Sequence, residues 1–201
     1  ASVSIFVLTL LFSLPLGLLV AFARMSKIKP LQWITKFYIS IMRGTPLMLQ
    51  LLVVYFGPYY VFRQNISTEY RFYATIIGFS INYAAYFAEI YRSGIQSIPV
   101  GQREAAKVLG YSRVQTFWKI IFPQMVKRVL PPVTNEVITL VKDTSLARII
   151  ALQEIIWAGQ AFMKGSQGIS GAIWPLFFTA FYYLIWNGIM TVLLGRLERK
   201  L

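Results

Sequence analysis

Four carboxylates lie inside or beside long apolar stretches of this sequence: Glu89, Glu136, Asp143 and Glu154. Ionisable groups at membrane depth are costly, and they commonly mark a pathway for a polar solute or a network of paired charges. The chain has no histidine and no cysteine, so the commonest general base and the thiolate nucleophile are both missing. The pattern therefore favours binding of a positive group, and it predicts neither a metal site nor an intramembrane enzyme.

The predicted substrate-contacting residues surround an interrupted segment at the end of an apolar run, joined by two neutral amides from elsewhere in the chain. They are Asp143, Thr144, Ser145, Gln153 and Glu154, with Gln50 and Asn82. Broken helices are where membrane transporters place their substrates. The acids can accept hydrogen bonds from an ammonium group, and the hydroxyls, the Asn82 amide and free backbone N–H groups can donate to a carboxylate.

Ion pairs are the competing interpretation of these acids. Asp143 can pair with Lys142 or Arg148, and Glu154 can pair with Arg148 or Lys164.

Two further carboxylates are expected to be structural. Glu89 precedes Arg92 by three residues, which favours a local ion pair on one helix. Glu136 follows Pro132 by about one turn, and we expect it to satisfy backbone groups that the prolines free.

Composition defines the elements that must position these residues. The 201-residue chain is 57% hydrophobic and only 13% charged, whereas soluble domains are about 25% charged. It reads as a single all-α membrane domain, residues 1–201, with about five transmembrane helices. The predicted spans are Ala1 to Ala23, Pro46 to Phe62, Phe72 to Tyr91, Ile120 to Val141 and Ile173 to Leu194. Ser145 to Gln160 is too short and too polar to span, so a short helix or a re-entrant segment is expected there.

Lysine and arginine counts in the loops predict the orientation of these spans. One side collects 15 of the 20 basic residues, which places the N-terminus outside and the C-terminus in the cytoplasm. The net charge of +13 then sums the cytoplasmic loops, and no nucleic-acid partner is predicted. The bilayer lipid is the expected surroundings.

The stretch GQREAAKVLG, residues 101–110, is short and charged and lies between the third and fourth spans. Pro99 and Gly101 mark its start and Gly110 its end, so we expect a helix of about two turns. Glu104 is expected in the first turn, where it suits the helix dipole. From its spacing alone, the segment reads as an amphipathic helix on the membrane surface.

Several motifs change that interpretation. EAA at 104–106, Gly110 and the run IIFP at 120–123 resemble the EAA loop of ATP-binding-cassette (ABC) importer permeases. The stretches RGTPLMLQLLVVYFG, AAYFAEIYRSGIQSIPVGQREAA and NEVITLVKDTSL are similar to permeases of the polar amino acid uptake group. The resemblance covers about Leu8 to Arg196. It departs from the family at Phe122, where leucine is usual, and at residues 149–154, where a Gly-Val-Pro-Glu ending is usual.

The resemblance implies a type I ABC importer permease in the bacterial cytoplasmic (inner) membrane. Its coupling loop, about residues 93–119, would dock into a cytoplasmic ABC ATPase subunit. The coupling residues would be Arg103, Glu104, Ala105, Ala106, Lys107, Leu109 and Gly110. No GxxxxGK[ST] motif is present, so ATP and magnesium belong to that ATPase, and this chain is expected to bind no cofactor. A second permease chain, identical or different, and an extracytoplasmic solute-binding protein would complete the complex.

The expected substrate is a polar amino acid. Four acids near membrane depth against few basic residues favour a cationic one, such as arginine or lysine, over glutamine and glutamate. The alternative function is a stand-alone secondary transporter or a channel for small polar solutes. Neither paired halves with matching broken helices nor a selectivity-filter sequence is evident.

Overall fold

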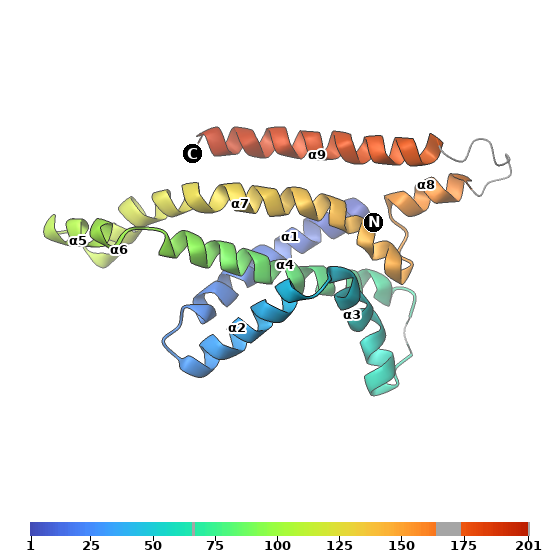
Figure 1. Cartoon of the computed structure of the whole chain (residues 1–201), viewed down its shortest axis with the longest axis horizontal. Coiled ribbons are helices and arrows are strands. Elements are labelled where there is room, and N and C mark those ends of the chain that lie inside the picture. Colours follow the sequence, from blue (N-terminus) through green and yellow to red (C-terminus); the bar gives the residue numbers. More distant parts are fainter. Residues whose placement is uncertain (66, 164–173, 201) are drawn as a thin grey trace.

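All the regular structure in residues 1–65, 67–163 and 174–200, which the computed structural model describes, is helical. The long helices are α1 (Ser2–Arg24), α4 (Tyr70–Gln96), α7 (Phe122–Asp143) and α9 (Trp174–Lys200). The shorter ones are α2 (Lys29–Gly44), α3 (Leu47–Phe62), α5 (Val100–Val108), α6 (Arg113–Thr116), the π-helix η1 (Phe117–Ile121), the 3₁₀ helix η2 (Thr144–Ile150) and α8 (Ile155–Met163). Figure 1 shows α4, α7 and α9 running along the long axis, with α5 and α6 at one end.

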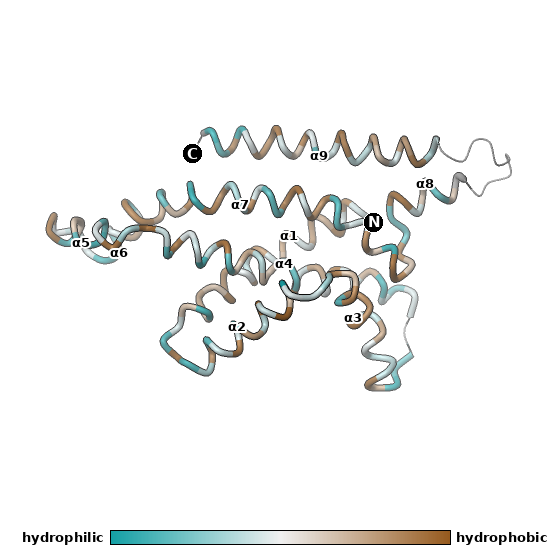
Figure 2. The backbone as a smooth tube through the Cα atoms, viewed as in Figure 1, coloured by the Kyte–Doolittle hydropathy of each residue, from teal (hydrophilic) through white to brown (hydrophobic). Residues whose placement is uncertain are grey.

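Helices occupy each of the five predicted spans. Helices α1 and α9 are long and apolar enough to cross a membrane by themselves, and Figure 2 shows α9 apolar along most of its length. Helices α2 and α3 qualify only together, and they bend by 110° at the break between them. That all five segments cross the bilayer, and on which side the termini lie, remain predictions.

Helix α2 has no counterpart among the predicted spans. It begins with Pro30 in its first turn, where the missing N–H group needs no partner. Lys29, Lys36 and Arg43 recur every seven residues, which places them in one row along the helix. These charges interrupt the apolar run, and this is why the hydropathy pattern alone did not reveal the helix.

Close packing of α1 on α4 forms the centre of the bundle. A Cβ atom at Gly17 would lie 2.8 Å from Phe87 Cβ and 3.1 Å from the backbone oxygen of Ala84. Ala84 and Ala88 are fully buried. Small residues of this kind let membrane helices approach closely, because packing rather than hydrophobicity drives their association.

Polar contacts attach neighbouring segments to α4. The hydroxyl of Tyr38 on α2 donates to the carbonyl of Ile81 on α4.

Arg92 donates through Nε to Glu89 Oε2 at 3.0 Å and also forms a salt bridge with Glu89. The ion pair predicted from their spacing is therefore confirmed.

Helices α4 and α7, which precede and follow the α5 segment, are held together near that segment. A Cβ atom at Gly94 would lie only 2.2 Å from Val129 Cγ2. Arg128 on α7 also donates to the carbonyl of Ser97, just beyond the end of α4. The C-terminal end of α4 is thus held against α7 by close packing and by a hydrogen bond.

The predicted interruption after α7 is confirmed. Helix α7 passes directly into η2, which ends at Ile150, and the next residue, Ala151, has a left-handed backbone with φ of 56°. Helix α8 then begins at Ile155. The last predicted span, from Ile173, corresponds to α9, which begins at Trp174; residue 173 itself lies outside the described residues.

The α1–α4 contact makes a first prediction. Gly17→Val places side-chain atoms against the α4 backbone, which cannot move aside without separating the helices, so we expect a loss of about 1–3 kcal/mol. Thermal unfolding of the detergent-purified chain, followed by tryptophan fluorescence, should show a midpoint several degrees lower. Gly188→Val is the matched control, because a Cβ at Gly188 meets nothing within 4 Å. Equal midpoints for the two variants would contradict this packing.

Candidate functional site

A row of polar and aromatic side chains connects α7, α4 and α2. The hydroxyl of Tyr83, a buried residue of α4, donates to Asp143 Oδ2 at 2.6 Å. The ring of Tyr83 lies 6.2 Å from that of Tyr86, measured between centroids. The guanidinium carbon of Arg43 lies 5.3 Å from the centroid of Tyr86. The carboxylate of Asp143 and the guanidinium of Arg43 thus lie at opposite ends of a pair of tyrosines.

Glu136 lies on the same face of α7 as Asp143, two helical turns earlier. It is half-buried and close enough to Asp143 and Arg43 to interact with their charges. Among the described residues it has neither a hydrogen bond nor a salt bridge, so the predicted role in satisfying backbone groups was wrong. The seven-residue spacing from Asp143 was the sequence signal that could have joined the two acids.

The two amides predicted to line the substrate path lie together. Asn82 Nδ2 donates to Gln50 Oε1 at 2.9 Å and to the carbonyl of Met42 at 3.1 Å. Gln50 Nε2 donates to the same carbonyl at 3.0 Å and to Thr45 Oγ1 at 2.8 Å. Both side chains therefore fix the corner between α2 and α3 against α4.

Glu154 is the predicted site residue with the most surprising environment. It is 4% exposed, and its two carboxylate oxygens accept hydrogen bonds from the backbone N–H groups of Ile156 and Trp157, both at 2.7 Å. A carboxylate in this position satisfies the free N–H groups at the start of a helix, here α8. No salt bridge to Arg148 is present in the described part of the chain, and Lys164 lies outside it.

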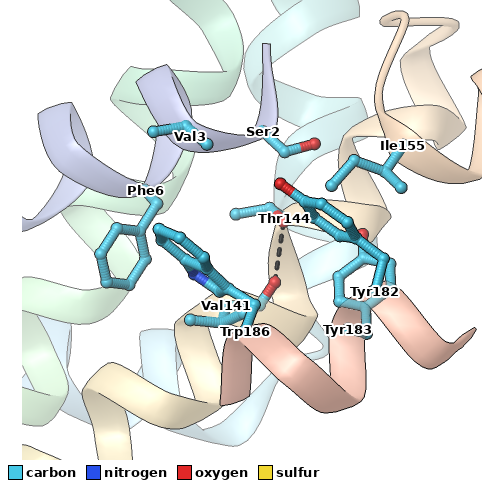
Figure 3. A pocket seen from close by; sticks show the side chains of 9 residues that line it. All are labelled: Ser2, Val3, Phe6, Val141, Thr144, Ile155, Tyr182, Tyr183 and Trp186. Atoms are coloured by element: carbon cyan, nitrogen blue, oxygen red, sulfur yellow. Dashed lines mark hydrogen bonds between the residues drawn. The ribbon is translucent and has the colours of Figure 1, made fainter. Parts of the chain in front are cut away.

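Thr144, Ser145 and Gln153 do not converge on Asp143. Thr144 is buried and donates to the carbonyl of Val141 at 2.8 Å. Figure 3 shows it in a small cavity between α1, η2 and α9, lined also by Tyr183 and Trp186. The cavity volume is about 20 Å³, enough for about one water molecule and too small for an organic substrate. Ser145 is half-buried and Gln153 is exposed.

Helix α5 carries the second group of predicted functional residues. It ends in a pair of backbone hydrogen bonds, from Gly110 N to Lys107 O at 3.1 Å and from Tyr111 N to Ala106 O at 3.0 Å. Gly110 has φ of 78°, the left-handed conformation that this type of helix end requires. The predicted helix and its glycine terminus are confirmed.

Two details of α5 differ from the sequence prediction. The helix begins at Val100, so Glu104 lies beyond its first turn and the expected dipole contact there is wrong. Ala106 is 1% exposed, so it packs within this chain and cannot contact a partner. The remaining predicted residues of the segment face outward: Arg103, Glu104, Ala105, Lys107, Leu109 and Gly110.

A groove runs beside α5. Its lining includes the cations Arg103, Lys107 and Arg113 and the rings of Tyr111 and Phe117. Val108 and Leu109 at the end of the helix are 87% and 73% exposed. A surface with three cations next to exposed apolar side chains suits a partner that offers carboxylates and an apolar ridge.

Comparisons with known proteins agree with this arrangement. The family profile described as binding-protein-dependent transport system inner membrane component matches residues 13–201. The chain is 35% identical over 195 residues to the L-cystine transport system permease protein TcyB of Bacillus subtilis, covering 97% of this chain and 81% of that protein. It is 34% identical over 200 residues to the arginine transport system permease protein ArtQ of Bacillus subtilis, covering 100% and 89%.

A solved structure described as an amino acid ABC transporter with histidines has a TM-score of 0.87 and 32% identity, covering 100% of this chain and 90% of that chain. The inward-facing MetNI methionine ABC transporter, at 18% identity and a TM-score of 0.70, shares the fold. Together with the EAA loop, the α5 geometry and the match over residues 13–201, these relatives place the chain in a family. It belongs to the binding-protein-dependent transport system inner membrane components, and it is an ABC importer permease of the polar amino acid uptake group.

Proposed function

We propose that this permease forms the membrane pathway for a polar amino acid with a positive side chain, such as arginine or lysine. The observation that carries the proposal is the acidic face of α7. Asp143 keeps one hydrogen bond to Tyr83, and Glu136 has no partner among the described residues. A cationic amino acid has two positive groups, and two carboxylates on one helix that form no salt bridge in the described residues suit both.

The spacing of the two acids supports the same substrate class. Seven residues on a helix correspond to about 10.5 Å along the axis. Carboxylate side chains that reach toward each other shorten this distance to a length that the two charged ends of a lysine or arginine can bridge. A neutral side chain such as that of glutamine would leave one carboxylate without a counter-charge. The relatives are named for cystine, arginine, glutamine and octopine, so their names do not decide the substrate of this chain, and the proposal rests on the charges of the site.

Glu154 has a different role in this proposal. Because both of its oxygens already accept backbone hydrogen bonds, it holds the start of α8 and leaves the substrate to Glu136 and Asp143. Gln50 and Asn82 likewise act on the shape of the site rather than on the substrate.

The transport cycle needs partners. An extracytoplasmic binding protein would deliver the amino acid, and a cytoplasmic ATPase that holds ATP and magnesium would dock on α5. The N-terminus would lie outside, the C-terminus and α5 in the cytoplasm, and the five spans in the bacterial inner membrane. Helices α2, α3 and α9 have exposed apolar faces in the single chain, so one chain does not enclose a pathway by itself. Two permease chains would therefore face each other above two ATPase subunits.

Assembly is the first test of this function. Native mass measurement of the complex purified with its ATPase should give four membrane-complex subunits, two permeases and two ATPases. A transport-competent monomer would contradict the proposal.

The acidic site gives a second prediction. Glu136→Gln keeps the size of the side chain and removes its charge. The rate of uptake of labelled arginine should fall by the factor that corresponds to the loss of one charged hydrogen bond, about 1.5–3 kcal/mol. Glu198→Gln, which removes a carboxylate near the end of α9, is the matched control. Unchanged arginine uptake in Glu136→Gln would remove this residue from the site, and a wild-type preference for glutamate would overturn the cationic substrate.

The coupling role of α5 gives a third prediction. Gly110→Val forces a β-branched residue into a left-handed backbone, which costs at least about 1–2 kcal/mol and deforms the end of the helix. Glu104→Lys reverses an exposed charge. We expect both variants to insert normally and to lose ATP-driven uptake, while Gly101→Ala, where a Cβ meets nothing within 4 Å, keeps it. If uptake survives while the ATPase still co-purifies, α5 is not the coupling element.

A further inference from the structure

The guanidinium of Arg43 stands out among the basic groups at this end of the bundle. It is exposed in the last turn of α2 and lies over the ring of Tyr86 on α4. In the part of the chain that the structure describes, it makes no salt bridge and no hydrogen bond. Arg92, by contrast, is fully engaged with Glu89 and Gln96. Arg43 is therefore a positioned cation whose five N–H donors have no hydrogen-bond partner among the described residues.

The backbone beneath Arg43 is held rigidly. The carbonyl of the preceding residue, Met42, accepts hydrogen bonds from both Asn82 and Gln50. The hydroxyl of Thr45 donates to the carbonyl of Ile41 at 2.8 Å. The amides of buried Asn82 and half-buried Gln50 thus fix the turn from which Arg43 extends, and the ring of Tyr86 lies against its guanidinium from one side.

Arg43 has no acidic neighbour in its own part of the chain, since residues 1–68 contain no aspartate or glutamate. Two acids from other helices lie close enough to interact with its charge, Glu89 on α4 and Glu136 on α7, and Glu89 is already paired with Arg92. Glu136 forms no salt bridge with Arg43. The cation on α2 and the carboxylates on α7 therefore stand apart, with Tyr86 against the cation and Tyr83 hydrogen-bonded to Asp143.

We infer that Arg43 binds the α-carboxylate of the transported amino acid. The inference rests on the proposed function, because Glu136 and Asp143 then receive the positive groups of the same molecule. A planar guanidinium matches a carboxylate with two parallel hydrogen bonds, which a lysine ammonium cannot provide. An amino acid bound between Arg43 and these two acids would complete the charge pattern of the site: the carboxylate on α2, and the ammonium and the side chain on α7.

This assignment also explains why neutral amides occupy the corner between α2 and α3. A charged residue there would pair with Arg43 or repel it, whereas Gln50 and Asn82 fix its backbone and leave its guanidinium free. In the proposed site they are positioning residues.

Decarboxylated analogues test the inference directly. The permease–ATPase complex is purified, reconstituted in nanodiscs and equilibrated with labelled arginine, and agmatine, which has the same side chain and no carboxylate, is used as a competitor. The wild-type complex should bind arginine about 10- to 150-fold more tightly than agmatine, the range of a charged hydrogen bond. Arg43→Gln should weaken arginine binding to the level of agmatine, while agmatine, a dication that loses a like-charge neighbour, should bind no more weakly than to the wild type. Arg43→Lys, which keeps the charge and loses the fork, should fall between them.

Lys36→Gln is the matched control, because it removes one positive charge from the same row of α2, two turns away. It should keep the preference for arginine over agmatine. If the complex instead binds glutamine, 4-aminobutanamide replaces agmatine as the analogue, and the same loss of preference in Arg43→Gln supports the inference.

The two levels of the argument fail differently. A complex that binds an amino acid with the same preference over its decarboxylated analogue in wild type and in both Arg43 variants overturns the role of Arg43 alone. A complex that binds no amino acid and drives no uptake overturns the proposed function and this inference with it.

Discussion

The contact on which the rest of this structure depends is the close approach of α1 to α4 at Gly17. Lipid offers an apolar helix as favourable an environment as another helix does, so van der Waals contact between small residues must hold the pair together. Ala84 and Ala88 supply the matching surface on α4. Helices α2, α3 and α7 all pack on α4, so the position of α4 determines theirs. The side chains of the candidate site inherit their positions from this one helix.

Helices α4 and α7 connect the candidate site to α5. Helix α4 carries Tyr83 and Tyr86 and leads toward α5 at its C-terminal end, and α7 returns from η1 and ends at Asp143. The clamp between Gly94 and Val129 makes α4 and α7 move together near α5. Coupling between distant sites needs rigid elements of this kind. A displacement imposed on α5 by a partner would therefore reach the acidic face of α7 through the short connections 97–99 and 109–112 and the helices beyond them.

Sequence reasoning succeeded where one signal dominates. Long apolar runs predict helices, and Gly110 predicts a left-handed helix end because few other residues adopt that backbone. It failed where a residue's partner is set by three-dimensional packing. Nothing in the sequence distinguishes a carboxylate that caps a helix from one that binds a substrate, so Glu154 was assigned to the path. The mistake at Ala106 has the same origin, because a small side chain suits a partner surface and an internal contact equally well. Helix α2 was missed because its basic row hides an otherwise apolar helix.

The polar residues of the bundle divide into two groups by charge. The neutral amides, Asn82 and Gln50, use their hydrogen bonds on each other and on the backbone of the α2–α3 corner. Arg43 and Glu136 remain without hydrogen bonds in the described residues, at the surface that one chain leaves open. Charged groups left unpaired near a bilayer are unfavourable in the empty protein. In the proposed site, a ligand of matching charge bound between them would lower this cost, so a substrate would stabilise the arrangement that the packing of α1 and α4 fixes.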